Sequence, residues 1–236
     1  MFLIFDDRPS DSSFVERVWR CHSERAGRFI SIASSLWEMV VTRHRGETTL
    51  TVRGPETKAT TIECPAEGEW LGIRFRLGTF MPQLPVVNLL DRKDVTLPGA
   101  GGRSFWLNGS AWEYPDFGNA ETFVARLVKG SVIAHDAAVK AALRGERQAL
   151  SLRSTQRHFL QATGMTHGTF RQIERARYAT NLLKQGVSIL DTVHEAGFFD
   201  QAHLTRSLKR LIGQTPAKII RQEEQLSFLY KTTPFR

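Results

Sequence analysis

The sequence predicts an α+β fold, with a β-rich N-terminal domain (residues 1–130) followed by an all-α domain (residues 131–236) that contains two helix-turn-helix units. Hydrophobic residues repeat with a period of two in the first part and of about 3.6 in the second. A helix pattern in the second part recurs after 49 residues. Residues 1–130 hold 16 Lys+Arg and 16 Asp+Glu, whereas residues 131–236 hold 16 and 8, so the net charge of +8 lies entirely in the second part.

Strands are expected over about the first 80 residues. Leu71, Ile73, Phe75 and Leu77 alternate with glycine and arginine, which is typical of a half-buried strand. Residues 38–53 predict a hairpin that turns around Gly46, and residues 14–19 and 29–32 predict further strands. A helix should then close the domain, because Phe123, Val124, Leu127 and Val128 share one helical face before Gly130.

Caps and stop residues divide the C-terminal domain into helices. Ser188 to Asp191 forms a capping box, Asp200 is a good N-cap, and Pro216 stands at the favoured first helical position. Gly197 separates the third helix from the fourth. We expect helices over residues 151–163, 166–185, 188–196 and 200–213, and a last helix from Pro216.

Two of these helices repeat each other. The matching positions are an N-cap, an arginine, an apolar anchor, a stop glycine and the cap of the next helix. They are Ser151 and Asp200, Arg157 and Arg206, Phe159 and Leu208, Gly164 and Gly213, and Thr166 and Thr215. The second copy is complete, because a short apolar helix and a glycine turn precede it, which is the helix-turn-helix pattern.

The second helix of such a unit can enter the major groove and reach base edges from its first turns. Arginine pairs with guanine and glutamine with adenine, whereas lysine and arginine further along a helix suit phosphates. The candidate DNA-binding residues are Arg153, Ser154, Gln156 and Arg157 in the first copy, and Gln201, His203, Arg206, Lys209 and Arg210 in the second. A plain helical bundle with solvated polar faces is the alternative.

These residues also resemble a known family. The run Ala196-Gly197-Phe198-Phe199-Asp200-Gln201-Ala202-His203-Leu204-Thr205-Arg206, then Leu208-Lys209-Arg210 and Gly213-Gln214-Thr215-Pro216, resembles the signature of AraC/XylS-type regulators. Ser151-Leu152-Arg153-Ser154-Thr155-Gln156-Arg157-His158-Phe159, followed by Thr163-Gly164-Met165-Thr166, is similar to that family's first recognition helix and its exit. The resemblance covers about residues 137–221. It implies two helix-turn-helix subdomains joined by one long helix, and a role in transcription regulation.

The N-terminal domain resembles the β-rich, cupin-like sensor domains attached to such regulators, on residues 72–78 and 89–92. This resemblance implies control by a small-molecule effector or by dimerisation. Candidate ligand-binding residues are Trp37, Arg43, Arg74 and Arg76. Arginines at alternating strand positions more often form a solvated face, and a tryptophan such as Trp37 more often lies in the core.

Other chemistry finds little support in the sequence. No phosphate-binding loop and no nucleophile elbow is present. Cys21, His22, His44 and Cys64 lack the spacing of metal ligands, so no metal and no cofactor is expected. The expected function is therefore that of a sequence-specific DNA-binding transcriptional regulator, not an enzyme. The alternative is a helical protein-interaction module or a cupin-like enzyme.

The expected partners follow from that function. They are double-stranded DNA, a small-molecule effector, a second copy of the chain and, for an activator, RNA polymerase. The choice between activation and repression stays open. No apolar run is long enough to cross a membrane and no secretory signal is recognisable, so the expected location is the cytoplasm.

Overall fold

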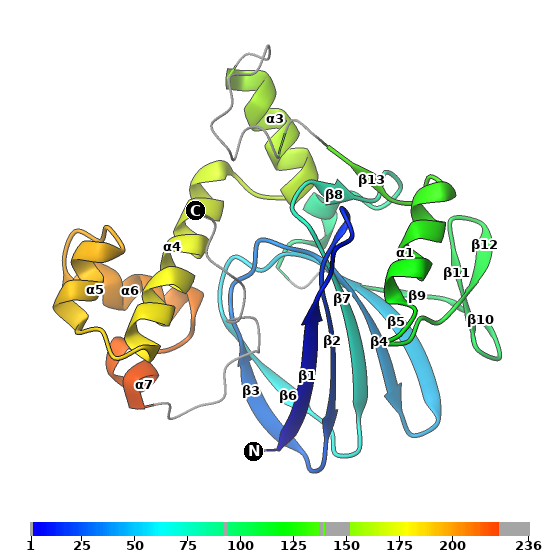
Figure 1. The fold of residues 1–236 in the computed structure, drawn as a ribbon, viewed down its shortest axis with the longest axis horizontal. Helices are drawn as coiled ribbons and strands as arrows, with labels where there is room; N and C mark the ends of the chain where they lie inside the picture. The colour runs from blue at the N-terminus through cyan, green and yellow to red at the C-terminus, as the bar shows by residue number, and fades with distance from the viewer. Residues whose placement is uncertain (1, 92–93, 137–138, 140–151, 222–236) are drawn as a thin grey trace. The chain divides into compact units, whose positions relative to one another are not determined.

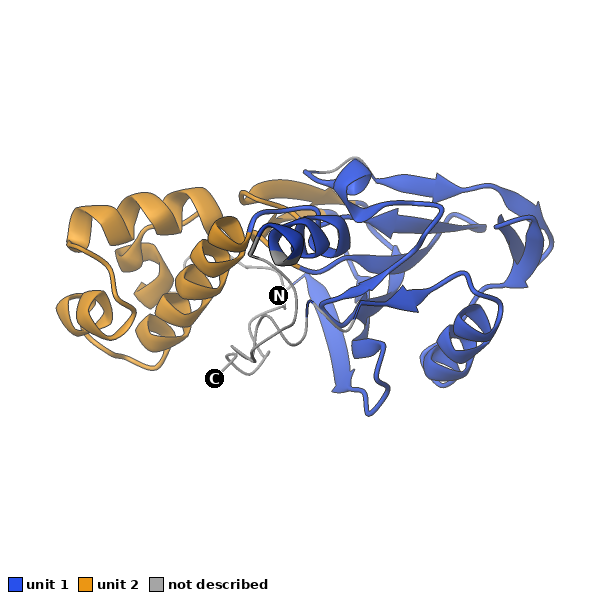
Figure 2. Cartoon of the chain, turned by 90° about the horizontal axis from the view of Figure 1, so that it is seen from above, with its two compact units in different colours: residues 1–26, 36–55, 65–166 blue, residues 27–35, 56–64, 167–236 orange. Residues whose placement is uncertain are grey.

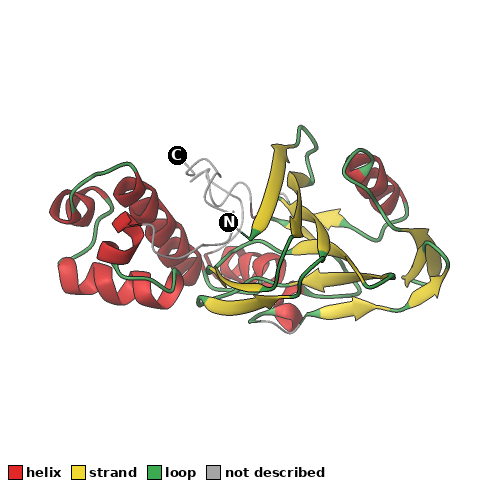
Figure 3. Ribbon diagram, turned by 90° about the horizontal axis from the view of Figure 1, so that it is seen from below, coloured by secondary structure: helices red, strands yellow, loops and turns green. Residues whose placement is uncertain are grey.

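A computed structural model describes residues 2–91, 94–136, 139 and 152–221. A strand-rich N-terminal region precedes a helical C-terminal region (Figures 1 and 3), which confirms the predicted α+β class. Contacts divide the chain into two compact units that do not follow chain order (Figure 2). Unit 1 comprises residues 1–26, 36–55 and 65–166, and unit 2 comprises residues 27–35, 56–64 and 167–236. The predicted boundary between two domains at residue 130 stays a prediction.

The centre of unit 1 is a six-stranded antiparallel sheet in the order β1-β2-β7-β4-β5-β9. The strands are β1 (Leu3–Pro9), β2 (Val15–Ser23), β7 (Glu69–Phe75), β4 (Glu38–His44), β5 (Glu47–Arg53) and β9 (Val95–Leu97). Ile73 on β7 lies opposite Val18 on β2 and Met39 on β4, and all three are buried. Because cross-strand neighbours share a face, this register gathers the apolar residues into one core.

The predicted hairpin is confirmed as β4 and β5. Its strands pair from Glu38 with Arg53 to His44 with Glu47, which leaves only Arg45 and Gly46 in the turn. Both turn residues have positive φ, 50° and 81°. Two such residues are what a two-residue turn needs to match the right-handed twist of its strands.

Smaller elements complete unit 1. They are β8 (Thr79–Phe80) paired with β13 (Ala134–His135), the 3₁₀ helix η1 (Val86–Leu89), the meander β10 (Gly99–Gly101), β11 (Ser104–Leu107) and β12 (Ser110–Glu113), and the helix α1 (Ala120–Lys129). Helix α1 buries Phe123, Val124 and Leu127 in the core of the sheet and ends at Gly130, as predicted.

Helix α3 (Leu152–Thr163) also belongs to unit 1, where it packs against η1. Its Phe159 is buried, and His158 Nδ1 lies 2.8 Å from Asp136 Oδ2. Gly164 ends the helix with a φ of 71°, and a Cβ at this position would lie 3.1 Å from the carbonyl oxygen of Val86. The predicted cap Ser151 lies outside the described residues.

Unit 2 contains the helices α4 (His167–Lys184), α5 (Ile189–Glu195), α6 (Gln201–Leu211) and α7 (Pro216–Arg221). Their bounds follow the predicted ones within about two residues, because Ser188, Asp200 and Pro216 start helices locally. Phe170, Ile173, Leu183, Val193 and Leu208 are among the residues buried between them. None of the helices within the described ranges is both long and apolar enough to span a bilayer.

A two-stranded ribbon also belongs to unit 2. It consists of β3 (Gly27–Ser31) and β6 (Thr60–Cys64), which pair antiparallel and form no strand of the six-stranded sheet. Ser34 and Glu56 continue the ladder through two backbone hydrogen bonds of 2.9 Å. A segment from the strand-rich region is thus part of the helical unit.

Candidate nucleic-acid interface

The segment from α5 to α6 has the geometry of a helix-turn-helix. The hydroxyl of Ser188 accepts a hydrogen bond from the Asp191 amide at 3.1 Å, which caps α5. Gly197 has a φ of 68°, and the next amide, of Phe198, donates to the Val193 carbonyl oxygen at 2.9 Å. Asp200 then caps α6 by accepting from the His203 amide at 2.6 Å. The two helices therefore begin and end where the sequence predicts.

Helix α4 fixes this turn. The side chain of Phe198 is buried, and the guanidinium of Arg175 lies 4.6 Å from the centre of its ring. Arg175 also donates a hydrogen bond of 3.2 Å to the carbonyl oxygen of Gly197. His203 on α6 packs edge-on against the same ring, with 5.3 Å between ring centres. One aromatic side chain thus joins α4, the turn and the first turn of α6.

Helix α6 separates an apolar face from a cationic one. Leu204, Leu208 and Leu211 are buried, whereas Gln201, Arg206, Lys209 and Arg210 are exposed and His203 is half-buried. No carboxylate among the described residues forms an ion pair with Arg206, Lys209 or Arg210. The positive charge on this face is therefore available to a polyanion.

Helix α3 carries the candidate residues of the first unit. Arg153, Gln156 and Arg157 are exposed, Ser154 is half-buried, and Thr163 closes the helix by donating to the Phe159 carbonyl oxygen at 2.7 Å. Residues 140–151, which include the region before this helix, lie outside the described residues. The nine predicted DNA-binding residues thus fall into two sets, one on α3 in unit 1 and one on α6 in unit 2.

Comparison with known proteins identifies the class of this region. Residues 146–222 match the family model described as a helix-turn-helix domain. The predicted resemblance is confirmed: the chain carries a helix-turn-helix domain of the AraC type.

One relative is the HTH-type transcriptional regulator RipA of Corynebacterium glutamicum. It is 36% identical over 72 residues, which is 30% of this chain and 22% of the relative. The chain therefore matches less than a quarter of that protein's length. No solved structure matches the chain significantly.

The four candidate ligand-binding residues are not brought together. Trp37 stacks on Phe75 in the core, with 3.9 Å between ring centres. Arg74 is 1% exposed and lies 3.4 Å from the Glu38 carboxylate, although strand alternation favours a solvated side chain. Arg76 donates to the carbonyl oxygens of Ser10 and Ser12, at 2.7 and 2.8 Å. Arg43 lines a pocket formed by β1, β2, β4, β7 and residues 116–118, and the other three residues do not line that pocket.

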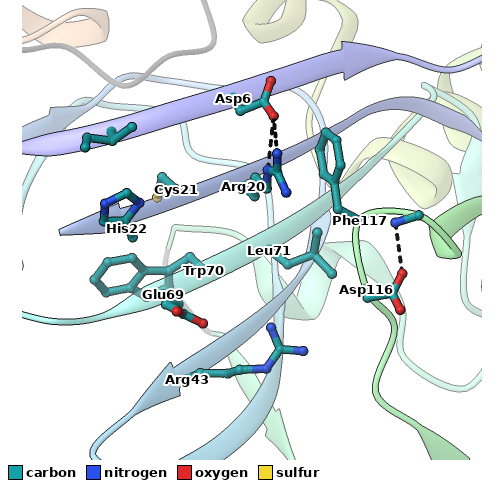
Figure 4. Close-up of a pocket in the computed structure, with 12 residues that line it drawn as sticks. Asp6, Arg20, Cys21, His22, Arg43, Glu69, Trp70, Leu71, Asp116 and Phe117 are labelled. Carbon is teal, nitrogen blue, oxygen red and sulfur yellow. Dashed lines mark hydrogen bonds and ion pairs between the residues drawn. The ribbon is translucent and has the colours of Figure 1, made fainter.

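That pocket has a volume of about 660 Å³ and lies in unit 1 (Figure 4). Arg20, His22, Glu69 and Leu71 line it from β2 and β7, and in the register Arg20 faces Leu71 and His22 faces Glu69. These positions continue the sheet face on which Val18 and Ile73 are buried. The pocket is thus the place where the apolar core face becomes polar.

Charges of both signs line this pocket. Arg20 is paired with Asp6 at 2.8 Å and stacks on Phe117 at 4.5 Å. Arg43 and Glu69 lie directly opposite each other on β4 and β7, and no side-chain hydrogen bond or ion pair joins either to a described residue. Of these residues only Arg43 was a predicted ligand-binding residue, because Arg20 and Glu69 alternate with their neighbours as on an ordinary solvated strand face. Within the described ranges, no cluster of three His, Cys, Asp or Glu side chains could hold a metal ion.

Proposed function

We propose that the chain is a sequence-specific DNA-binding regulator of transcription that reads bases with α6 and α3. The observation that carries the proposal is the capped α5–turn–α6 unit, whose second helix presents Arg206, Lys209 and Arg210 without acidic partners among the described residues. A helix of this kind fits the major groove, and its free cations replace the counterions of the phosphates. The helix-turn-helix family match supports the same function.

The position of each side chain on α6 supports a division of roles. Gln201, His203 and Arg206 lie in the first two turns, from which recognition helices contact base edges. Lys209 and Arg210 lie in the last turn and suit phosphates. On α3, Arg153, Ser154, Gln156 and Arg157 take the equivalent places. Two different recognition helices favour a bipartite site without a palindrome, its halves one helical turn or ~34 Å apart.

Selection from a library of random duplexes, with the full chain at about 150 mM salt, tests the proposal. We expect one enriched motif with two protected segments on one face of the duplex in a hydroxyl-radical footprint. Enrichment without a common motif would mean non-specific binding. No retention of DNA would favour the alternative of a helical protein-interaction module.

The pocket in unit 1 supports a second element of the proposal, control by a small-molecule effector. Arg43 suits a carboxylate and Glu69, opposite it, suits an ammonium group, while Trp70 and Phe117 offer aromatic surface. The favoured ligand is therefore a small compound that carries both a carboxylate and an ammonium group, such as an amino acid, and in particular an aromatic amino acid. Effector control requires that this ligand bind the DNA-competent state with a different affinity from the other state.

The twenty amino acids and simple aromatic carboxylates form a defined probe set for this pocket. We expect at least one to raise the melting temperature of the full chain and to shift its affinity for the selected duplex. Arg43→Ala should remove both effects and leave DNA binding without ligand unchanged. If ligand effects persist in Arg43→Ala, the effector binds elsewhere.

Dimerisation and contact with RNA polymerase belong to the same proposal, and DNA binding of this kind would place the chain in the cytoplasm. Sedimentation velocity of the full chain, with and without the selected duplex, tests the dimer. Transcription from a template that carries the selected motif, with purified polymerase, separates activation from repression.

A further inference from the structure

The side chain of Phe199 is unusually exposed for its size. It is 90% exposed, whereas Leu190 on α5, the next most exposed large apolar side chain among the described residues, is 64% exposed. The neighbouring Phe198 is buried and supplies the packing of the turn. A phenylalanine at position 199 is therefore not required by the core of unit 2.

The backbone holds Phe199 at the start of the recognition helix. It directly precedes the cap Asp200, and its amide donates to His203 Nδ1 at 3.4 Å. His203 is fixed in turn by its contact with Phe198 and by the Asp200 cap. The ring of Phe199 is thus attached to a fixed backbone, one helical turn from a residue proposed to contact bases.

We propose that Phe199 is a specificity-determining residue that packs against thymine methyl groups in the major groove. The inference rests on the proposed DNA-binding function. Thymine alone presents a methyl group in that groove, and phenylalanine is among the side chains that contact it. A single exposed ring is too small for a protein-docking surface, which usually covers several hundred Å². The cationic face of α6, with Arg206, Lys209 and Arg210, favours DNA as the occupant.

Replacing each thymine of the selected duplex in turn by deoxyuridine removes one methyl group and nothing else. We expect one or two positions in the half-site of α6 at which this replacement lowers the affinity of the full chain about fourfold. This factor corresponds to the free energy of burying one methyl group. At these positions Phe199→Ala should bind both duplexes equally, and Phe199→Leu should keep part of the discrimination. Leu190→Ala is the matched control and should behave as the unchanged chain does.

The outcomes separate this inference from the function on which it rests. Because Phe199 is exposed, its variants should melt at the temperature of the unchanged chain. A motif without methyl-sensitive thymines, or the same sensitivity in Phe199→Ala, would overturn the inference and leave DNA binding intact. If no duplex is selected, the proposed function itself is overturned.

A different observation concerns the other end of α6. The amides of Ala33 and Ala59 donate hydrogen bonds of 2.8 Å to the carbonyl oxygens of Leu211 and Arg210. Such carbonyls at the end of a helix have no partner within the helix. A Cβ at Gly213 would lie 2.8 Å from Ile30 Cγ2, so the ribbon approaches the helix end closely. Ser35 adds a hydrogen bond of 3.2 Å to Glu174 on α4.

We infer that the ribbon of β3 and β6 is a positioning element of the second helix-turn-helix and links it to the strand-rich region. Ile30 and Thr61 share one face of the ribbon, and Phe29 and Ile62 share the other. Ile30 is buried against the end of α6, whereas Ile62 is only half-buried. Since β3 and β6 continue by peptide bonds into residues of unit 1, displacement of these strands acts directly on the end of α6.

Hydrogen exchange of the full chain tests this link. Binding of the selected duplex should slow exchange in residues 27–35 and 56–64 together with residues 201–213. Ile30→Ala should speed exchange in residues 208–213 and lower DNA affinity several-fold, and Ile62→Ala, on the opposite face, should change both much less. Ser35→Ala is a milder second variant and should have a smaller effect of the same kind. Equal effects of Ile30→Ala and Ile62→Ala, or unchanged exchange in α6, would contradict the inference.

Discussion

The guanidinium of Arg175 stacks on the ring of Phe198 and donates a hydrogen bond to the carbonyl oxygen of Gly197, so a single side chain of α4 fixes the turn of the helix-turn-helix. Arg175 is half-buried, which strengthens both interactions relative to an exposed cation. The position of α6 therefore depends on a residue that need not contact DNA.

Arg175→Ala should destabilise unit 2 by about 1–3 kcal/mol, because it removes a cation–π contact and a charge-assisted hydrogen bond. DNA affinity should fall in similar proportion on all sequences. Thermal unfolding and binding to selected and scrambled duplexes measure the two effects. Arg171→Ala, on an exposed position one turn earlier in α4, is the control. A loss confined to the selected duplex would instead mean that Arg175 contacts bases.

Arg206→Ala should cost about 1–3 kcal/mol on the selected duplex and relax the preference at a few base pairs. Lys209→Ala should weaken selected and scrambled duplexes alike and reduce the salt dependence by about one counterion. Titrations at several salt concentrations separate the two. Equal losses on both duplexes for both variants would remove the distinction between a base contact and a phosphate contact.

Gly197→Ala should destabilise unit 2 by about 1 kcal/mol through the backbone alone. Its φ of 68° is unfavourable for a residue with a Cβ, yet a Cβ there would meet no atom within 4 Å. Gly197→Asn should cost less, because asparagine tolerates this conformation. Gly197→Val should cost most. Full stability of the valine variant would show that the turn does not need a positive φ.

The ion pair of Arg8 and Glu121 predicts a pH dependence. Arg8 donates to both carboxylate oxygens and lowers the pKa of Glu121 from 4.5 to about 2. Because the pKa of Glu121 is lower in the folded than in the unfolded chain, its ionisation stabilises the fold at pH values above about 4.5. This contribution is lost as the pH falls from about 4.5 towards 2. Since both side chains are about one-third exposed, we expect about 1 kcal/mol after solvent screening.

Glu121→Gln should therefore unfold more readily than the unchanged chain at pH 7, and the difference should disappear near pH 2. Urea unfolding at several pH values measures it. Glu113→Gln, at an exposed strand position, controls for the loss of one charge. A difference that persists at the lowest pH would mean that packing, not ionisation, accounts for it.

The helices of unit 2 could be predicted from the sequence because their signals are local. Ser188, Asp200 and Pro216 start helices through contacts within four residues, and Gly197 ends one in the same way. The hairpin at Gly46 was predictable for the same reason, since two residues determine its turn. Local chemistry thus gives the elements that carry the proposed recognition residues.

A strand at residues 29–32 could be predicted, but its pairing with β6, the contact of this ribbon with α6, and the pocket could not. Ala33 and Ala59 meet α6 through backbone amides, which carry no side-chain signal, across more than a hundred residues of sequence. Arg20 and Glu69 line the pocket only because β2 lies beside β7, and alternation alone cannot distinguish a pocket from a solvated face. Arg74 is buried for a similar reason, because Glu38 on the neighbouring strand lies next to it.

The most direct test of the central claim is the ratio of the affinities of the full chain for the selected duplex and for a scrambled one of equal length and composition. At about 150 mM salt we expect a ratio of at least ~10³, which is typical of sequence-specific binding. Arg206→Ala should reduce this ratio about fivefold or more, while Arg171→Ala leaves it unchanged. Equal affinity of the unchanged chain for the two duplexes would contradict the account.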